Sequence, residues 1–225
     1  MKYYMVPFSV GFFLLFCPAA AKAEPTSGEI RRIEAAIRVF NELPGKVPSD
    51  ILNDAKGRAV IPGAFRAGFI YGVELGGGVI VSRLPDGSWS PPAFISLAGA
   101  SFGFQIGAEA RDVVLIFNTA GSMEHIENGW LKLGADVSVA AGPVGGNVGA
   151  TTDLPEVLSY RSSVGAFIGA TVEGSLLSFD FGANRDLYGV PDPLKMKANR
   201  GIPDSALRFS CAVGRATGAP AGVCG

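Results

Sequence analysis

Short apolar segments separated by glycine-rich turns dominate the chain from about Arg58 onward, and this pattern restricts the fold more than any other feature of the sequence. Alternating or uniformly apolar runs of this length are typical of half-buried strands. Their close spacing predicts an antiparallel sheet folded on itself. We expect turns at Gly76-Gly77-Gly78 and at Pro85-Asp86-Gly87-Ser88. The expected strands cover residues 67–74, 79–83, 93–97, 101–108, 112–117, 131–140, 147–151, 157–162, 166–172 and 175–180.

Two helices are predicted ahead of the sheet. Thr26-Ser27-Gly28-Glu29 matches a capping box, and the helix that it opens ends near Leu43-Pro44-Gly45. A second, short helix would begin at Ser49 and end at Lys56-Gly57. The fold class is therefore α+β and β-rich, with two N-terminal helices followed by a compact antiparallel sheet or barrel-like sandwich. Helical turns are also expected at residues 122–127 and 184–188.

The first 23 residues have the three parts of a secretory signal. Lys2 supplies an early positive charge, residues 8–17 form a short apolar core, and Ala21 and Ala23 are the small residues that a signal peptidase accepts. We therefore expect an exported protein of the periplasm or cell envelope, peripheral to the membrane. The chain divides into a signal peptide (1–23), a single domain (24–190) and a C-terminal tail of little periodicity (191–225).

Charge argues against a nucleic-acid partner. Removal of Lys2 and Lys22 with the leader leaves 17 basic and 20 acidic residues, a net charge of −3. A mildly acidic chain lacks the basic footprint of a nucleic-acid binder. The charge is uneven, however, because residues 28–66 carry seven basic and five acidic groups.

Two cysteines, Cys211 and Cys224, remain after removal of the leader. An exported chain meets an oxidising compartment, so we expect these two to form a disulfide. Two free thiols in a loose tail remain the alternative, because two cysteines alone do not define a disulfide framework.

No catalytic machinery is visible. Residues 99–103 match the G-x-S-x-G nucleophile elbow around Ser101, but strand-like alternation follows where that motif requires a helix. The single histidine, His125, is too near in sequence to serve as the base of such an enzyme. One histidine and two distant cysteines give no metal site with usual spacing. We therefore expect a protein that is not an enzyme and that needs no metal or cofactor.

The helix over residues 28–43 has an apolar face and basic flanks. Ile30, Ile33, Ile37 and Phe40 share one side, whereas Arg31, Arg32 and Arg38 lie off it. Such a helix suits an anionic membrane surface. The more common use of an apolar helix face is packing on the helix's own domain, and the pattern leaves both possibilities open.

An ordered set of motifs between about residues 30 and 189 resembles the SYLF-domain family, in the form of an exported bacterial type that stands alone. The most specific stretch is Ser88-Trp89-Ser90-Pro91-Pro92-Ala93-Phe94-Ile95-Ser96-Leu97. The others that match in order begin at Val47, Ala67, Gly103, Asp112, Lys132, Ala140, Tyr160, Gly165 and Asn184.

The resemblance implies a lipid-binding domain that recognises anionic lipid or phosphoinositide-type headgroups at a membrane surface. Family members in yeast also bind actin, which we do not expect to meet an exported chain. The positions that match the family's basic lipid contacts are Lys56 and Arg66, with Arg31, Arg32 and Arg38 of the preceding helix as candidates. Arg58 stands where an aliphatic residue is usual, and Gly77 where members often have a basic one; Arg58 joins the candidate set.

A structural role as an outer-membrane β-barrel is the alternative function. Its spanning strands should run about 9–11 residues, whereas those expected here are mostly about 6–8 residues long. Extraction would separate the two functions, because a barrel requires detergent and a surface binder is released by salt or carbonate.

Cleavage between Ala23 and Glu24 is the testable consequence of the leader. N-terminal sequencing or intact mass of the protein recovered from the cell envelope should place Glu24 first. A chain that still starts at Met1 would remove the basis for export.

Overall fold

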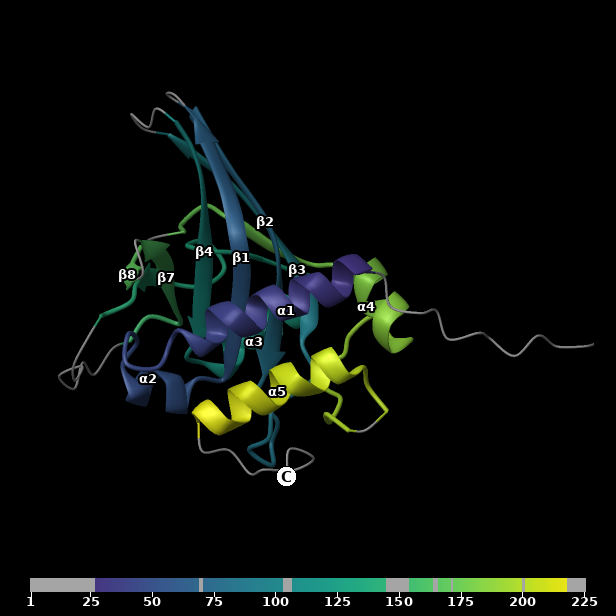
Figure 1. Ribbon diagram of the computed structural model, residues 1–225. Coiled ribbons are helices and arrows are strands. Elements are labelled where there is room, and N and C mark those ends of the chain that lie inside the picture. The colour runs from purple at the N-terminus through teal and green to yellow at the C-terminus, as the bar shows by residue number, and fades with distance from the viewer. Residues whose placement is uncertain are drawn as a thin grey trace, which may run out of the picture.

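The computed structural model describes residues 27–68, 71–102, 107–144, 154–163, 166–170, 172–199 and 201–217. These residues form one curled, half-barrel-like sheet with helices packed on both of its faces (Figure 1). The helices are α1 (Ser27–Asn41), α2 (Ser49–Asp54), α3 (Ala120–Glu127), α4 (Phe181–Tyr188) and α5 (Asp204–Ala216). The strands are β1 (Gly57–Gly68), β2 (Tyr71–Ser82), β3 (Ala93–Phe102), β4 (Gly107–Phe117), β5 (Trp130–Lys132), β6 (Val139–Ala141), β7 (Val157–Ser163), β8 (Ala166–Gly169) and β9 (Leu176–Phe179).

The sheet has the strand order β5-β9-β3-β2-β1-β4-β7-β6, and β8 pairs with β7. All neighbours are antiparallel except β6 and β7. The predicted α+β class with a mostly antiparallel sheet is thus confirmed. Figure 1 shows α1 and α5 across the lower half of one face, while β1 and β2 extend well beyond them.

The sheet separates two hydrophobic clusters. On the helix side, Ile33 and Phe40 of α1 pack with Phe209 of α5 against valines of the central strands. On the opposite side, Met123 and Ile126 of α3 cover the other face of the same strands. Alternation of side chains along each strand produces this two-sided burial.

The expected helices form close to where the sequence places them. Ile33 and Phe40 of the apolar stripe of α1 are buried and Ile37 is partly buried beside them, so this helix packs on its own domain. Thr26, the expected cap, lies outside the described residues. Helix α2 begins at Ser49 as predicted, but Pro48 is its N-cap residue, and Gly57 begins β1 instead of ending the helix. The helical turns expected near residues 122 and 184 are α3 and α4, capped by Thr119 and Asp180.

The turn expected at Gly76-Gly77-Gly78 is wrong, because these glycines lie inside β2, paired with residues 95–97 of β3. Gly76 and Gly78 allow the close approach of β1 rather than a turn. A methyl group on Gly78 would overlap the Val60 carbonyl oxygen and lie 2.8 Å from Ile61 Cα, and one on Gly76 would lie 3.3 Å from Ala64 Cα. The central strands β1–β4 consequently run 10–12 residues, longer than the short strands expected.

Some expected strands differ in other ways. The run at 131–140 divides into β5 and β6, separated by a turn that contains Gly134 at φ +84°. The strand expected at 147–151 lies outside the described residues. Strands β7, β8 and β9 form within the predicted ranges, give or take one residue.

The loosely attached tail expected after residue 190 is also wrong. Helix α5 occupies residues 204–216, and its Ala206, Phe209 and Val213 are buried in the helix-side cluster. Their spacing of three and four residues is that of a buried helix face. The C-terminal segment is therefore part of the domain.

Substituting Gly78→Ala should destabilise the protein strongly, because the added methyl group meets backbone atoms that cannot move aside. We expect a loss of about 3 kcal/mol, seen as a fall in Tm of about 6–12 °C in a thermal melt. The matched control is Gly121→Ala in α3, where an added Cβ meets nothing within 4 Å. Equal melting temperatures for the two variants would refute the close-approach explanation.

Candidate functional site

Helices α1 and α5 lie side by side and present arginines to the outside. Arg31 and Arg38 are seven residues apart on α1, and Arg208 and Arg215 are seven apart on α5, so each pair lies on one exposed helix face. We call these four residues the basic helical face. Arg208 forms an ion pair with Glu34 of α1. Among the described residues, Arg31, Arg38 and Arg215 have no ion pair within 4 Å.

The apolar sides of the same two helices hold this face in place. Phe40 of α1 and Phe209 of α5 meet with ring centroids 5.9 Å apart, and both are almost fully buried. Ring contacts of this kind add to the burial of the apolar area. The outward arginines are therefore carried by rigid helices. Arg208 and Arg215 were not among the candidates, because the sequence pattern of the α5 segment predicted a C-terminal tail.

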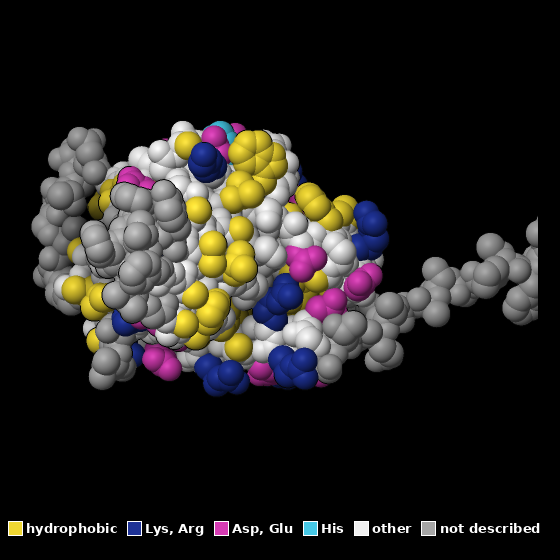
Figure 2. Space-filling model, turned by 90° about the horizontal axis from the view of Figure 1, so that it is seen from above, with side chains coloured by type: hydrophobic (Ala, Val, Ile, Leu, Met, Phe, Trp, Pro, Cys, Tyr) yellow, Lys and Arg dark blue, Asp and Glu magenta, His cyan; other side chains and the backbone are white. Residues whose placement is uncertain are grey.

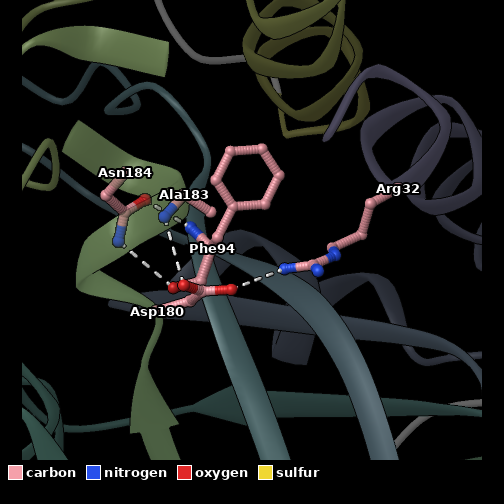
Figure 3. Close-up of polar contacts among 5 residues, drawn as sticks. All are labelled: Arg32, Phe94, Asp180, Ala183 and Asn184. Atoms are coloured by element: carbon pink, nitrogen blue, oxygen red, sulfur yellow. Dashed lines mark hydrogen bonds and ion pairs between the residues drawn. The ribbon is translucent and has the colours of Figure 1, made fainter. Parts of the chain in front are cut away.

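Arg32 points the opposite way, into the fold (Figure 3). Its Nη1 donates to Asp180 Oδ2 at 3.2 Å, and its guanidinium carbon lies 5.2 Å from the centroid of the Phe94 ring. Asp180 also accepts from the Ala183 amide at 3.1 Å, which caps α4. A Cβ on Gly77 would lie 3.3 Å from the Arg32 guanidinium. Arg32 therefore joins α1 to the sheet and to α4, in space that a side chain at position 77 would take.

Arg58 is buried, which removes it from the set of surface contacts. It is 1% exposed, lies between the Phe40 and Trp89 rings at 5.4 and 4.7 Å from their centroids, and donates from Nη2 to the Leu52 carbonyl. The alternation of β1 directs this side chain under α1. Arg58 was expected to join the lipid contacts as a basic residue where the family usually has an aliphatic one, but the fold buries it.

Burial lowers the pKa of Arg58 to about 9, and repulsion from Arg83 adds to the effect. The group therefore remains charged at neutral pH. Because this folded pKa lies below the value in an unfolded chain, the desolvation cost is fully present below pH 9. It decreases as the pH rises from there toward 12.5.

Lys56 and Arg66 lie at the two ends of β1. Lys56 is exposed where β1 begins, next to Arg83, whose amide donates to the Lys56 carbonyl at 2.8 Å. Arg66 is partly buried near the other end and faces the side of the sheet opposite to α1. The six candidates therefore do not converge. Arg31 and Arg38 share a surface, Lys56 is exposed elsewhere, and Arg32, Arg58 and Arg66 make contacts within the fold.

Arg66 lines a small polar cavity on the inner side of the curled sheet. The cavity measures about 110 Å³ and is also bordered by Glu74, Arg161, Glu173 and Ser175. Arg161 Nη2 donates to Glu74 Oε2 at 2.6 Å, with both side chains less than 10% exposed. Two arginines and two glutamates balance each other, so the cavity has no excess positive charge for an anionic headgroup.

The residues considered for catalysis and disulfide formation lie apart from these surfaces. Ser101 lies within β3 opposite Gly72, rather than at a strand-to-helix turn. His125 is exposed on α3. The described residues contain no cluster of three or more side chains that could hold a metal ion. Cys211 is buried in α5 and disulfide-bonded, but Cys224 lies outside the described residues, so its pairing with Cys211 stays a prediction.

Comparison with known proteins supports the SYLF resemblance. Residues 98–199 match the family described as Ysc84, Las17-binding protein actin regulator. LAS seventeen-binding protein 3 of Saccharomyces cerevisiae (strain ATCC 204508 / S288c) is 42% identical over 149 residues, which cover 64% of this chain and 32% of that protein. SH3 domain-containing YSC84-like protein 1 of Homo sapiens is 35% identical over 170 residues, 71% of this chain and 49% of that protein. The chain thus spans a third to a half of the length of these relatives and is similar to them across most of its domain.

Arg58→Ala should lower stability and spare any surface function. The variant leaves a gap between Phe40 and Trp89 and removes two cation–π contacts, which we expect to cost about 3 kcal/mol. Arg58→Met refills the gap without the charge and should recover at least half of the loss. Thermal melts decide this. If Arg58→Met is as unstable as Arg58→Ala, the charge and its bond to the Leu52 carbonyl matter more than the filled volume.

Proposed function

We propose that this protein binds anionic lipid headgroups at a membrane surface and catalyses no reaction. The observation that carries the proposal is the basic helical face, in which Arg31, Arg38 and Arg215 are exposed. Each basic group held near an anionic membrane contributes about 1 kcal/mol to binding. Three such groups on one rigid face are sufficient for peripheral attachment, even though the chain as a whole is slightly acidic.

Attachment through headgroups fits the packing of α1 better than insertion of the helix. Ile33 and Phe40 are buried in the helix-side cluster, so inserting this apolar face into lipid would expose a core of the domain. Within the described residues, no helix has both the length and the apolar character to cross a bilayer. The membrane contact proposed here therefore uses the folded domain with α1 in place.

The names of related proteins bear on the partner. The matched family is described as an actin regulator, but we do not propose actin for this chain, because its leader points to export. We keep export to the periplasm or cell envelope as part of the proposal. Lipid is then the partner that the basic helical face and the SYLF resemblance have in common.

The test is co-sedimentation with vesicles of phosphatidylcholine, with and without phosphatidylglycerol, at low and high salt. The triple variant Arg31→Ala/Arg38→Ala/Arg215→Ala should reduce partitioning onto the anionic vesicles roughly 100-fold. Raising the salt concentration to about 1 M should weaken binding of the unaltered protein as the Debye length falls to about 3 Å.

A matched control removes the same charge elsewhere. Lys132, Lys195 and Lys197 are exposed, and none belongs to α1 or α5. Their triple alanine variant should bind like the unaltered protein. Equal losses of vesicle binding in the two triple variants would show that net charge, rather than the basic helical face, causes binding. Equal binding of the unaltered protein to neutral and anionic vesicles would contradict the proposal.

A further inference from the structure

A face of small and apolar side chains is exposed where the four central strands extend beyond the helices. The strand register places these residues opposite one another in two rows that cross four strands. The first row is Ala98, Leu75, Phe65 and Ala110, and the second is Ala100, Val73, Ala67 and Ala108. We call these eight residues the apolar sheet face. Phe65, Val73 and Leu75 are 47%, 52% and 55% exposed.

Figure 2 looks onto this end of the molecule and shows hydrophobic side chains beside the strand ends, with lysine and arginine side chains interspersed with aspartate and glutamate along one edge. The eight side chains include no polar or charged group. Contiguous exposed apolar patches of this kind often mark surfaces that bind a partner or a membrane.

Three charged residues lie between the two rows, on the opposite face of the sheet, and we call them the line of charge. Arg66 of β1 lies opposite Glu74 of β2 and Glu109 of β4. Beyond this line the described ends of β1–β4 contain no charged residue, and neither do the sequences that connect β1 to β2 and β3 to β4. From the Phe65–Leu75 pair to the last pair of the hairpin, Gly68–Gly72, is three residues, or about 10 Å at strand spacing.

We infer that the apolar sheet face enters the interfacial region of an anionic bilayer, an inference that rests on the proposed membrane function. The depth of about 10 Å is at the upper end of the roughly 5–10 Å to which interfacial amphipathic helices bury their apolar faces at the boundary of headgroups and acyl chains. The line of charge lies on the opposite face of the sheet, so entry with the apolar sheet face toward the bilayer keeps Arg66, Glu74 and Glu109 on the water side, where charged groups need not leave water.

Basic residues lie where the headgroups would be. Gly77 is two residues from Leu75 on the same face of β2, and the space over Gly77 is taken by the guanidinium of Arg32. Helix α1 therefore crosses the sheet just below the apolar sheet face (Figure 1), and Arg31 and Arg38 of this helix are exposed. Apolar side chains beyond a basic border match the acyl and headgroup layers of an anionic membrane.

A second copy of the chain is a less suitable occupant. Four strands and two rows cover about 250 Å² at ordinary strand spacing, whereas a stable interface buries about 800 Å² on each partner. Five of the eight side chains are alanine and offer no anchor of the kind that dominates protein interfaces. A bilayer requires neither a minimum area nor a complementary shape.

The test compares Phe65→Ser/Leu75→Ser with a control that loses apolar side chains of similar exposure elsewhere, Trp130→Ser/Phe181→Ser; Trp130 and Phe181 are 57% and 47% exposed. Co-sedimentation with phosphatidylcholine–phosphatidylglycerol vesicles should fall about thirtyfold for the first pair, if about half of the exposed apolar area leaves water on insertion. The control should remain within about twofold of the unaltered protein. Thermal melts confirm that both variants are folded.

A direct measurement of depth compares Leu75→Trp with its parent in a Trp130→Phe background, where the buried Trp89 supplies the same signal in both, using vesicles of brominated phospholipid. Quenching of the new tryptophan by bromine on the acyl chains is expected, and vesicle binding without quenching would overturn the inference. Binding of Phe65→Ser/Leu75→Ser at the level of the unaltered protein would also overturn it and leave the headgroup proposal standing.

The remaining outcomes separate the two proposals. If the unaltered protein binds neutral and anionic vesicles equally and the Ser pair loses binding to both, insertion is supported and selection of anionic lipid is contradicted. Concentration-dependent dimers that the Ser pair abolishes, with vesicle binding unchanged, would assign the face to a second copy. No binding of the unaltered protein to either vesicle would refute both proposals.

Discussion

The pairing of β1 with β2 shifts register between Val60 and Phe65, and glycines of β2 lie against this irregularity. Bulges of this kind bend a strand and increase its twist. Gly63 takes φ +58° there, and its amide donates to Asp112 Oδ1 at 2.9 Å. Below this level the sheet is covered on both sides, and above it the strands continue without a helix layer. The glycines permit the crossing, and they also leave the space over Gly77 that Arg32 occupies.

Two arginines link the helices to the sheet and therefore stabilise the fold instead of contributing to the exposed surface. Arg58 contacts Phe40 of α1 and Trp89 beside β2, and Arg32 links α1 to Asp180 and Phe94. A buried guanidinium is costly to desolvate, and stacking on aromatic faces offsets part of that cost. Because these groups orient α1, they determine that Arg31 and Arg38 face outward. Arg32 therefore differs from Arg31 and Arg38 only in its angular position around α1.

The basic helical face and the apolar sheet face lie on the same side of the sheet, one beside the other along the strand direction. Their combination gives the two proposals a common geometry, in which the bare end of the sheet meets acyl chains while α1 stays at headgroup level. The polar cavity around Arg66 and Glu74 lies on the opposite face, with its charges balanced. It would remain on the water side, together with the line of charge.

Local patterns were sufficient to predict the α+β class, the extent of α1 and the approximate positions of most of the described strands, because amphipathic periodicity and capping act over a few residues. They did not predict most of β1, and the runs expected at 67–74 and 101–108 each span the ends of two strands. They also identified the helix that carries Arg31 and Arg38. Long-range packing decided the rest. Gly76-Gly77-Gly78 has the composition of a turn, and only the approach of Val60 and Ile61 keeps it within β2. Helix α5 becomes apparent through Phe209 meeting Phe40, a contact between distant parts of the chain. The aliphatic residue that the family usually has at position 58 was a signal of burial, but only the fold shows that Phe40 and Trp89 surround the Arg58 guanidinium. The apolar sheet face likewise depends on tertiary structure, because four strands from separate parts of the chain extend beyond the helices at the same level.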